Sequence, residues 1–310
     1  MLTHVFSYVH GWKVQPRSAR TYLRSAARSQ VMISQSNLPK FNDSAQAFQH
    51  LTDAELHRAI VLFSLIGKSW VVSVGSALAR IALALRIPMS WAIRPPVYAH
   101  FCGGESIADS EETIDKLSAH NVRTILDYSA EGQTDESDLD ATCSVVLATI
   151  QAAQGDARYA FAVFKVSGLS SNALLEKVST SLAGGKSLSQ SEQIAWERVQ
   201  KRVRTLCEAT AQAGGRVMID AEESWIQDAI DELAEDMMSD YNRDRVVVYN
   251  TVQLYRHDRL VYLENMASRA EEGGYMCGVK LVRGAYMEKE RQRASNLGYP
   301  SPIQPDKASS

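Results

Sequence analysis

Charged side chains directly follow two apolar, β-rich runs in the middle of the chain. Lys165 comes after the run 161–164 (FAVF), and Asp220 comes after the run 216–219 (RVMI). A charge at the end of a buried run is costly unless it meets a counter-ion or a ligand, so both residues are candidates for a binding site. Two simpler interpretations stay open: Lys165 can extend its ammonium group to solvent, and Asp220 can serve only as the N-cap of the next helix.

The segment 280–286 (KLVRGAY) combines cations, small residues and an aromatic ring. Lys280 and Arg283 supply positive charge, Gly284 and Ala285 let backbone N–H groups come close to a ligand, and Tyr286 adds a ring. By itself this combination indicates a site for an anion or a planar ring.

Other familiar site patterns are absent from the sequence. The cysteines are far apart and build no CxxC pattern, and the histidines build no HExxH, so we expect reduced, structural cysteines and no metal site. No GxGxxG follows a predicted strand, no GxSxG elbow occurs, and the segment 184–187 (GGKS) lacks the first glycine of a phosphate loop. The net charge of -3 and the pI of about 6.2 make nucleic acid an unsuitable partner.

The elements that must position these residues alternate between strands and helices. The β-branched runs predict strands at 122–126, 159–166, 216–219, 245–249 and 277–282, and the stretches between and after them predict helices at 138–153, 191–213, 225–238, 256–272 and 287–296. Strict alternation of this kind predicts a parallel sheet in an α/β fold.

Polar residues follow every one of the predicted strands. They are Asp127 with Tyr128, Lys165, Asp220, Asn250 with Gln253, and Arg283 with Tyr286. A barrel gathers all carboxyl ends around one mouth, whereas an open doubly wound sheet arranges them along an edge, so we favour a (β/α)8 barrel. Only five β/α units are visible, however, and the sequence predicts an incomplete barrel in which roughly three units, on the order of 80 residues, are absent.

The first part of the chain has a different organisation. Residues 43–120 predict a helical arm, with a capping signal at Thr52 and Glu55 before a helix near Asp53, and a second helix at 69–86. The most apolar stretch, 59–93, is interrupted by charged residues, so we expect no transmembrane segment. We therefore divide the chain into a leader (1–42), this arm (43–120) and a partial barrel (121–310).

The leader contains six basic residues and no Asp or Glu: Lys13, Arg17, Arg20, Arg24, Arg28 and Lys40. This pattern is typical of an organelle transit peptide, which would direct the protein to the mitochondrion. Two alternatives are a disordered basic arm and translation that begins at Met32. In a bacterium we would expect the cytoplasm, with peripheral association with the inner membrane.

Four runs taken together resemble the proline dehydrogenase family: FAVFKVSG (161–168), VMIDAEES (217–224), VVVYNTVQLYRHDRL (246–260) and GVKLVRGAYMEKER (278–291). The resemblance is most specific in the last two runs and extends more loosely through FCGGE (101–105) and ILDYSAEG (125–132), so that it covers about residues 43–308. It implies a (β/α)8 barrel that binds FAD, oxidises L-proline to 1-pyrroline-5-carboxylate and passes the electrons to a quinone.

The resemblance also implies roles for particular residues. Lys165 is similar to the family lysine near the substrate carboxylate and the flavin, and Asp220 to the acid on the next strand; their opposite charges could set each other's protonation states. Lys280 stands where some members carry an arginine near the reactive flavin edge, and Tyr286 resembles the aromatic wall of the substrate pocket. The implied cofactor-binding residues are Ala221, Gln253, Lys280, Val282, Arg283, Gly284 and Ala285.

Other interpretations of the function stay open at this point. The family's Thr-His-Asn flavin contact and paired arginines have no counterpart before Ser310, so the chain could be an inactive fragment of such an enzyme. A phosphate-binding barrel lyase or aldolase with Lys165 as its Schiff base is another class.

Overall fold

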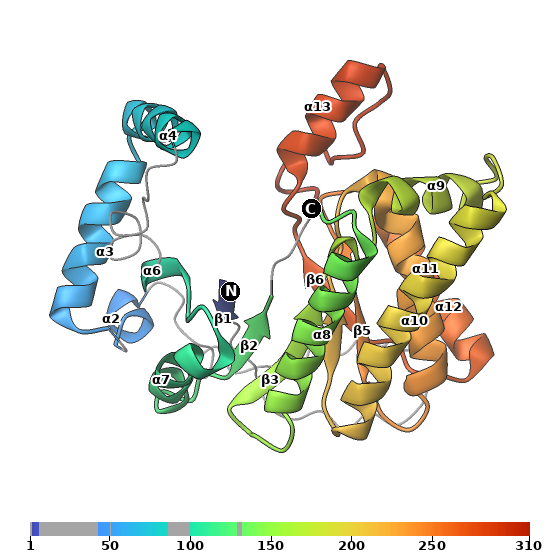
Figure 1. The fold of residues 1–310 in the computed structure, drawn as a ribbon, viewed down its shortest axis with the longest axis horizontal. Helices are drawn as coiled ribbons and strands as arrows, with labels where there is room; N and C mark the ends of the chain where they lie inside the picture. The colour runs from blue at the N-terminus through green and yellow to red at the C-terminus, as the bar shows by residue number, and fades with distance from the viewer. Residues whose placement is uncertain (1, 6–42, 50, 86–98, 129–131) are drawn as a thin grey trace. The chain divides into compact units, whose positions relative to one another are not determined.

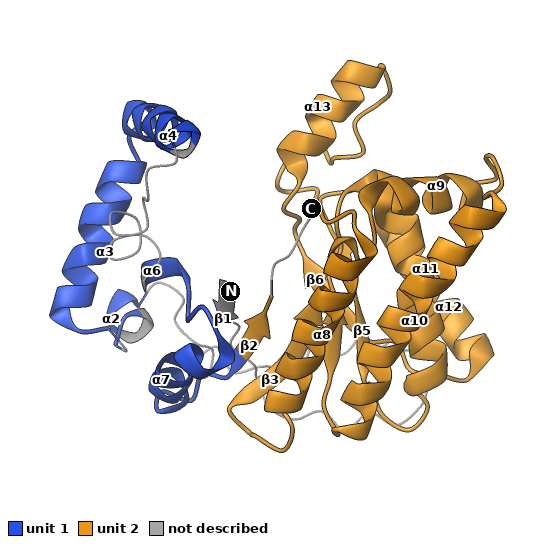
Figure 2. Cartoon of the chain, in the orientation of Figure 1, with its two compact units in different colours: residues 1–8, 29–124 blue, residues 9–28, 125–310 orange. Residues whose placement is uncertain are grey.

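The computed structural model describes residues 2–5, 43–49, 51–85, 99–128 and 132–310, and the chain divides into two compact units (Figures 1 and 2). Unit 1 comprises residues 1–8 and 29–124, and unit 2 comprises residues 9–28 and 125–310. Within the predicted leader, only strand β1 (Leu2–Val5) is described. The proposed start at Met32 and the transit-peptide pattern lie outside the described residues.

The described part of unit 1 beyond β1 is helical. Its helices are α2 (Ser44–Ala47), α3 (Asp53–Ile66), α4 (Ser69–Ala84), α6 (Ala99–Phe101) and α7 (Ile107–Ser118). The capping box predicted before α3 is present: the Glu55 amide donates to Thr52 Oγ1 over 3.3 Å, and the Thr52 amide donates to Glu55 Oε2 over 2.7 Å. The helix start at Asp53 is therefore confirmed.

Unit 2 is built from alternating strands and helices. The strands are β2 (Thr124–Asp127), β3 (Tyr159–Phe164), β4 (Val217–Ile219), β5 (Val248–Gln253) and β6 (Val279–Val282), and they follow one another in the sheet in chain order. Each of the three pairings from β3 to β6 is parallel. The helices are α8 (Glu136–Ala152), α9 (Asn172–Leu182), α10 (Gln190–Gln212), α11 (Ser224–Tyr241), α12 (Arg259–Gly273) and α13 (Met287–Leu297), with a 3₁₀ turn η3 (Val166–Gly168) after β3.

The helices α8, α10, α11 and α12 lie side by side along one face of the strands (Figure 1), and each contacts the next in chain order. A doubly wound sheet would carry helices on both faces. One layer of helices outside a parallel sheet is instead the arrangement of a β/α barrel, which confirms the fold class predicted from the strand ends.

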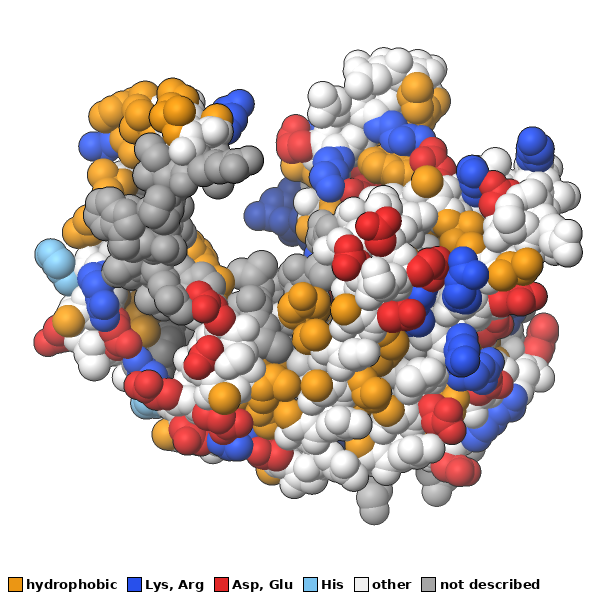
Figure 3. Space-filling view, viewed as in Figure 1, with side chains coloured by type: hydrophobic (Ala, Val, Ile, Leu, Met, Phe, Trp, Pro, Cys, Tyr) orange, Lys and Arg blue, Asp and Glu red, His pale blue; other side chains and the backbone are white. Residues whose placement is uncertain are grey.

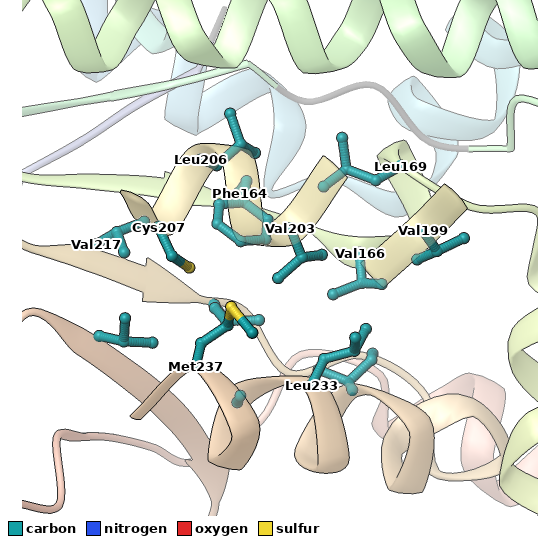
Figure 4. Packing of buried hydrophobic residues seen from close by; sticks show 14 of the residues in the cluster. Phe164, Val166, Leu169, Val199, Val203, Leu206, Cys207, Val217, Leu233 and Met237 are labelled. Atoms are coloured by element: carbon teal, nitrogen blue, oxygen red, sulfur yellow. The ribbon is translucent and has the colours of Figure 1, made fainter. Parts of the chain in front are cut away.

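The core lies between the sheet and this helical layer (Figure 4). Phe164 of β3 and Val217 of β4 pack with Leu206 and Cys207 of α10 and with Met237 of α11. The four cysteines, all within the described residues, are free thiols, and Cys207 is fully buried in this core. Because side chains alternate along a strand, the residues next to these core positions point to the opposite, concave face of the sheet.

On the concave face, residues from neighbouring strands form layers. Val163, Met218 and Tyr249 are direct register partners across β3, β4 and β5, and they belong to a second, smaller apolar cluster. Lys165, Asp220 and Thr251 each come two residues after these positions, so their side chains point to the same concave face. Thr251 is in turn the register partner of Lys280 on β6. The predicted charged residues therefore share one layer at the carboxyl ends of the strands.

Two sequence predictions need correction. The strand predicted at 245–249 spans 248–253 instead, because Asn250, Thr251 and Gln253 are polar but buried within the strand. The Asn242 side chain accepts hydrogen bonds from the amides of Val247 and Val248, which places the strand start later than the apolar run. Helix α9 was not predicted at all, and its Ser171 N-cap, which accepts from the Leu174 amide, was the available signal.

Candidate active site

Asp220 and Lys280 form an ion pair at the concave mouth of the sheet. Lys280 Nζ lies 2.6 Å from Asp220 Oδ1, and the two side chains are 16% and 20% exposed. The strand between them contributes Thr251, whose short side chain donates to the Ile219 carbonyl and so turns away from the pair. The structure thus joins two residues that the sequence singled out separately.

The structure also shows whether Asp220 is the N-cap of α11, which was the simpler interpretation of this residue. The N-cap of α11 is Glu223 and not Asp220. Since Asp220 directs its carboxylate to Lys280, its capping role in the sequence interpretation is wrong. The position of Asp220 fits the other interpretation, in which it belongs to a binding site.

Lys165 is the first residue after β3 and the N-cap of the turn η3. It is half-buried, and its charge lies close enough to Glu222 to lower the pKa of that carboxyl. The interaction of Lys165 with Asp220 that the resemblance implies stays a prediction. In the structure, Lys280 is a hydrogen-bonded cation of Asp220, and Lys165 acts on Glu222.

Glu222 is a buried acid that the sequence analysis did not single out. Only 2% of it is exposed, and its carboxylate accepts hydrogen bonds from the Ser167 amide, over 2.9 Å, and from the Ser167 hydroxyl. Burial raises its pKa from 4.5 to about 7, against the lowering effect of the Ser167 hydrogen bonds. The only signal in the sequence was the run of acids in DAEE (220–223), where a solvent-facing cluster was the simpler expectation.

Replacing Glu222 by Gln should change how stability depends on pH. Because burial favours the protonated carboxyl, the folded protein binds this proton more tightly than the unfolded chain does. The free energy of unfolding should therefore fall as pH rises from 4.5 to about 7, by about 3 kcal/mol from this group, and stay level above. Glu222→Gln should lack this contribution in denaturant unfolding measured across that range.

The control for this experiment is Glu192→Gln. The pKa of Glu192 is lowered to about 2 by its hydrogen bonds with Lys177 and Ser189, so it titrates below the window that concerns Glu222. That variant should keep the wild-type slope between pH 4.5 and about 7. Identical slopes for wild type and Glu222→Gln would contradict the assignment of a raised pKa to Glu222.

Gln253 ends β5 with its side chain 1% exposed. Its Nε2 donates to the Glu222 carbonyl over 2.9 Å, and a carbonyl acceptor requires the NH₂ end of the amide at that place. The other end, Oε1, is buried and has no hydrogen-bond partner among the residues that the structure describes. An unsatisfied buried acceptor is costly, so Gln253 is positioned to receive a hydrogen bond from a bound group.

The segment after β6 approaches the ring of Tyr255 very closely. The Tyr255 amide donates to the Arg283 carbonyl over 2.8 Å, and a Cβ on Gly284 would lie 2.2 Å from the ring. Gly284 also has φ of 138°, which L residues rarely adopt. Arg283 and Ala285 on either side are exposed, so this bend presents a cation and a short stretch of backbone to a ligand.

Helix α13 is anchored to the turn that follows β4. The amide and the hydroxyl of Ser224 both donate to the Glu290 carboxylate, each over 2.6 Å, and Lys289 Nζ lies 2.7 Å from Glu223. Tyr286, the half-buried N-cap of α13, is thereby held beside the same end of the sheet. Val282 ends β6, and Ala221, which is buried, follows Asp220, so the predicted cofactor residues gather at these strand ends.

A parallel sheet with helices outside and charged side chains at its concave mouth defines a β/α-barrel protein with a candidate active site at the carboxyl ends of the strands. The chain belongs to the proline dehydrogenase family: the family model described as "Proline dehydrogenase" matches residues 110–310.

Two curated relatives illustrate the similarity. The carbapenem antibiotics biosynthesis protein CarD of Pectobacterium carotovorum is 35% identical over 192 residues, which cover 62% of this chain and 50% of that protein. The mitochondrial proline dehydrogenase 1 of Drosophila melanogaster is 38% identical over 114 residues, covering 37% of this chain and 17% of that protein. The chain therefore spans half or less of the length of these relatives.

Among solved structures, the chain is similar to proline utilization A from Bdellovibrio bacteriovorus. The TM-score is 0.59 at 18% identity, over 71% of this chain and 24% of that one. This likeness concerns the fold, and it agrees with an incomplete (β/α)8 barrel in the part of the chain that matches.

Proposed function

We propose that the protein containing this chain is an FAD-dependent proline dehydrogenase that oxidises L-proline to 1-pyrroline-5-carboxylate and passes the electrons to a quinone. The observation that carries the proposal is the layer of Lys165, Asp220 and Lys280 at the mouth of a barrel of the proline dehydrogenase family. Membership of the family supports the reaction class, and it gives no support to a lyase that uses Lys165.

The residues present fit a flavin. The buried, unsatisfied Gln253 Oε1 requires a hydrogen-bond donor, and an isoalloxazine ring carries an N–H group. Gly284 allows the bend after β6 to pack closely on Tyr255, and the exposed Arg283 beside it offers a cation to a phosphate or to the ring edge. We propose that Ala221, Val282 and Ala285 complete this cradle together with Lys280.

Bound FAD would supply the acceptor for the hydride that leaves the proline carbon next to nitrogen. We propose that Lys165 attracts the substrate carboxylate and that Lys280, held by Asp220, keeps a positive charge next to the flavin. The secondary amine of proline must also lose a proton, and Asp220 is the carboxylate at the mouth that can accept a hydrogen bond from it. Tyr286 would form the apolar wall against the substrate ring.

Flavin binding tests the cofactor assignment. FAD titrated into the purified full-length protein should bind and show the blue and near-ultraviolet absorption bands of a protein-bound flavin. Gln253→Leu should weaken this binding by about tenfold. The substitution removes the buried Oε1, which is proposed to accept a hydrogen bond from the flavin. FAD affinity that is unchanged in Gln253→Leu would exclude the ring contact proposed for this residue.

We also propose peripheral membrane association through α3 and α4. No single helix in the described residues is long and apolar enough to span a bilayer, although α3 and α4 together reach the threshold as a pair bent by 90°. Large apolar side chains are exposed along both helices, and Figure 3 shows them gathered over α4; they include Phe63, Trp70, Val74, Leu78 and Ile81. Such a surface suits either a bacterial inner membrane or a mitochondrial one.

Vesicle sedimentation tests this surface. Trp70→Lys with Leu78→Lys should reduce binding to vesicles of phosphatidylglycerol and phosphatidylcholine by about tenfold, because two exposed apolar groups are lost. Ile194→Lys on α10 is the matched control, since Ile194 is exposed but lies in unit 2. Equal binding by the α4 double variant and the control would contradict docking through α4.

A further inference from the structure

The turn after Lys165 is held from the end of the neighbouring strand. Within η3, the Gly168 amide donates to the Lys165 carbonyl over 3.2 Å, and the Leu169 amide donates to the Val166 carbonyl over 2.8 Å. The Ser167 amide instead donates to the Glu222 carboxylate, and the Ser167 hydroxyl donates to the other oxygen of the same group. Two hydrogen bonds from one residue to one carboxylate fix both the position and the orientation of the turn.

The backbone of Glu222 is held by hydrogen bonds of its own. Its amide donates to the Gln227 side chain over 2.8 Å, and its carbonyl accepts from Gln253 over 2.9 Å. Gln227 in turn donates to Asp231, which forms a buried ion pair with Arg259 at 2.6 Å. The side chain of Glu222 therefore connects the turn at the end of β3 to a rigid polar network between β5, α11 and α12.

We infer that Glu222 is a positioning residue: through Ser167 it fixes the turn that aims Lys165 into the mouth of the barrel, and through its main-chain carbonyl it fixes the amide of Gln253. This inference rests on the function proposed above for Lys165 and Gln253. It assigns the side chain of Glu222 to the substrate side of the site, and only its backbone to the flavin side.

The role depends on hydrogen bonds and not on the negative charge. The charged groups that act on Glu222 are Lys165 and Glu223, and their effects on it are opposite in sign. A glutamine at this position can accept from the Ser167 amide through its oxygen and donate to the Ser167 hydroxyl through its NH₂ group. Glu222→Gln can therefore keep the geometry without the charge, whereas Glu222→Ala loses both hydrogen bonds.

Amide hydrogen exchange tests the positioning without any substrate. In the full-length protein without added FAD, Glu222→Ala should exchange the amides of residues 165–169 at least about tenfold faster than wild type, because the Ser167 amide loses its acceptor. Glu222→Gln should recover most of the protection, and Glu192→Gln should exchange this segment like wild type. Wild-type protection of residues 165–169 in Glu222→Ala would overturn the inference, whether or not the protein proves to be a proline dehydrogenase.

Kinetics of the FAD-loaded protein then separate the two sides of the site. Glu222→Ala should raise the KM for L-proline about tenfold or more by displacing Lys165, while its FAD affinity stays within about twofold because the carbonyl that holds Gln253 remains. Glu222→Gln should restore most of the KM. A Gln variant as defective as the Ala variant would overturn the hydrogen-bond role, and a wild-type protein that does not oxidise proline would instead refute the proposed function.

A second variant covers the case in which Glu222→Ala does not fold. Ser167→Ala removes the hydroxyl and keeps the amide, so one of the two hydrogen bonds to Glu222 survives. It should fold and raise the KM for L-proline about threefold, in the same direction as Glu222→Ala. An unchanged KM in Ser167→Ala, together with unchanged exchange of residues 165–169, would also overturn the inference.

Discussion

Gly284→Ala should abolish flavin binding and strongly destabilise unit 2. The new Cβ would lie 2.2 Å from the ring of Tyr255, a residue that is buried and only 3% exposed. The backbone at φ of 138° adds strain for any L residue. Together we expect a loss of about 3 kcal/mol or more in the free energy of unfolding, and a bend after β6 that no longer presents Arg283 to the cofactor.

The matched control is Gly298→Ala at the C-cap of α13. Gly298 has φ of 73°, but a Cβ there would meet nothing within 4 Å, so this variant has the backbone strain without the collision. It should lose about 1 kcal/mol and keep FAD binding. If Gly284→Ala were no less stable than Gly298→Ala, the close approach of the bend to Tyr255 would not be a real constraint on the fold.

Asp220→Ala should slow the reduction of bound flavin by L-proline about 10²-fold or more while leaving the fold intact. The residue lies at the strand mouth outside the apolar core, and its carboxylate holds Lys280 at 2.6 Å. Without it, the half-buried lysine loses its counter-ion and the substrate amine loses its carboxylate acceptor. Anaerobic stopped-flow measurement of flavin bleaching reports the rate, and the thermal unfolding midpoint reports the fold.

Asp228→Ala on α11 is the control for that variant, because Asp228 is an exposed aspartate close in sequence. It should reduce flavin at the wild-type rate. Asp220→Asn should fall between Asp220→Ala and wild type, since it keeps an acceptor oxygen but not the charge. Wild-type flavin reduction by Asp220→Ala would remove Asp220 from the proposed site.

The fold class could be predicted from the sequence because the apolar pattern is strong where strands are buried. In FAVFKVSG and VMIDAEES, the apolar run and the polar residue that ends it define both the strand and its carboxyl end. The start of β5 could not be predicted in the same way. Its Asn250, Thr251 and Gln253 find their partners on α11, on β4 and in the turn after β4, and such partners are visible only in three dimensions.

The residues of the candidate site could be predicted from the sequence, but the contacts between them could not. Lys165 and Asp220 each follow an apolar run and Lys280 lies within one, yet which cation meets Asp220 depends on the sheet register, in which Thr251 stands opposite Lys280. Glu222 was missed because its partner Ser167 is 55 residues away in the sequence. Its burial is visible only in three dimensions, and no local pattern distinguishes it from Asp220 and Glu223 in the same acidic run.

The most direct test of the account is the anaerobic addition of L-proline to the FAD-loaded full-length protein that contains this chain. We expect the flavin absorbance to bleach and one 1-pyrroline-5-carboxylate to form per flavin reduced. Trans-4-hydroxy-L-proline in a parallel cuvette shows which of the two substrates is preferred. A bound flavin that remains oxidised with both amino acids would contradict the proposed function and the substrate roles assigned to Lys165 and Asp220.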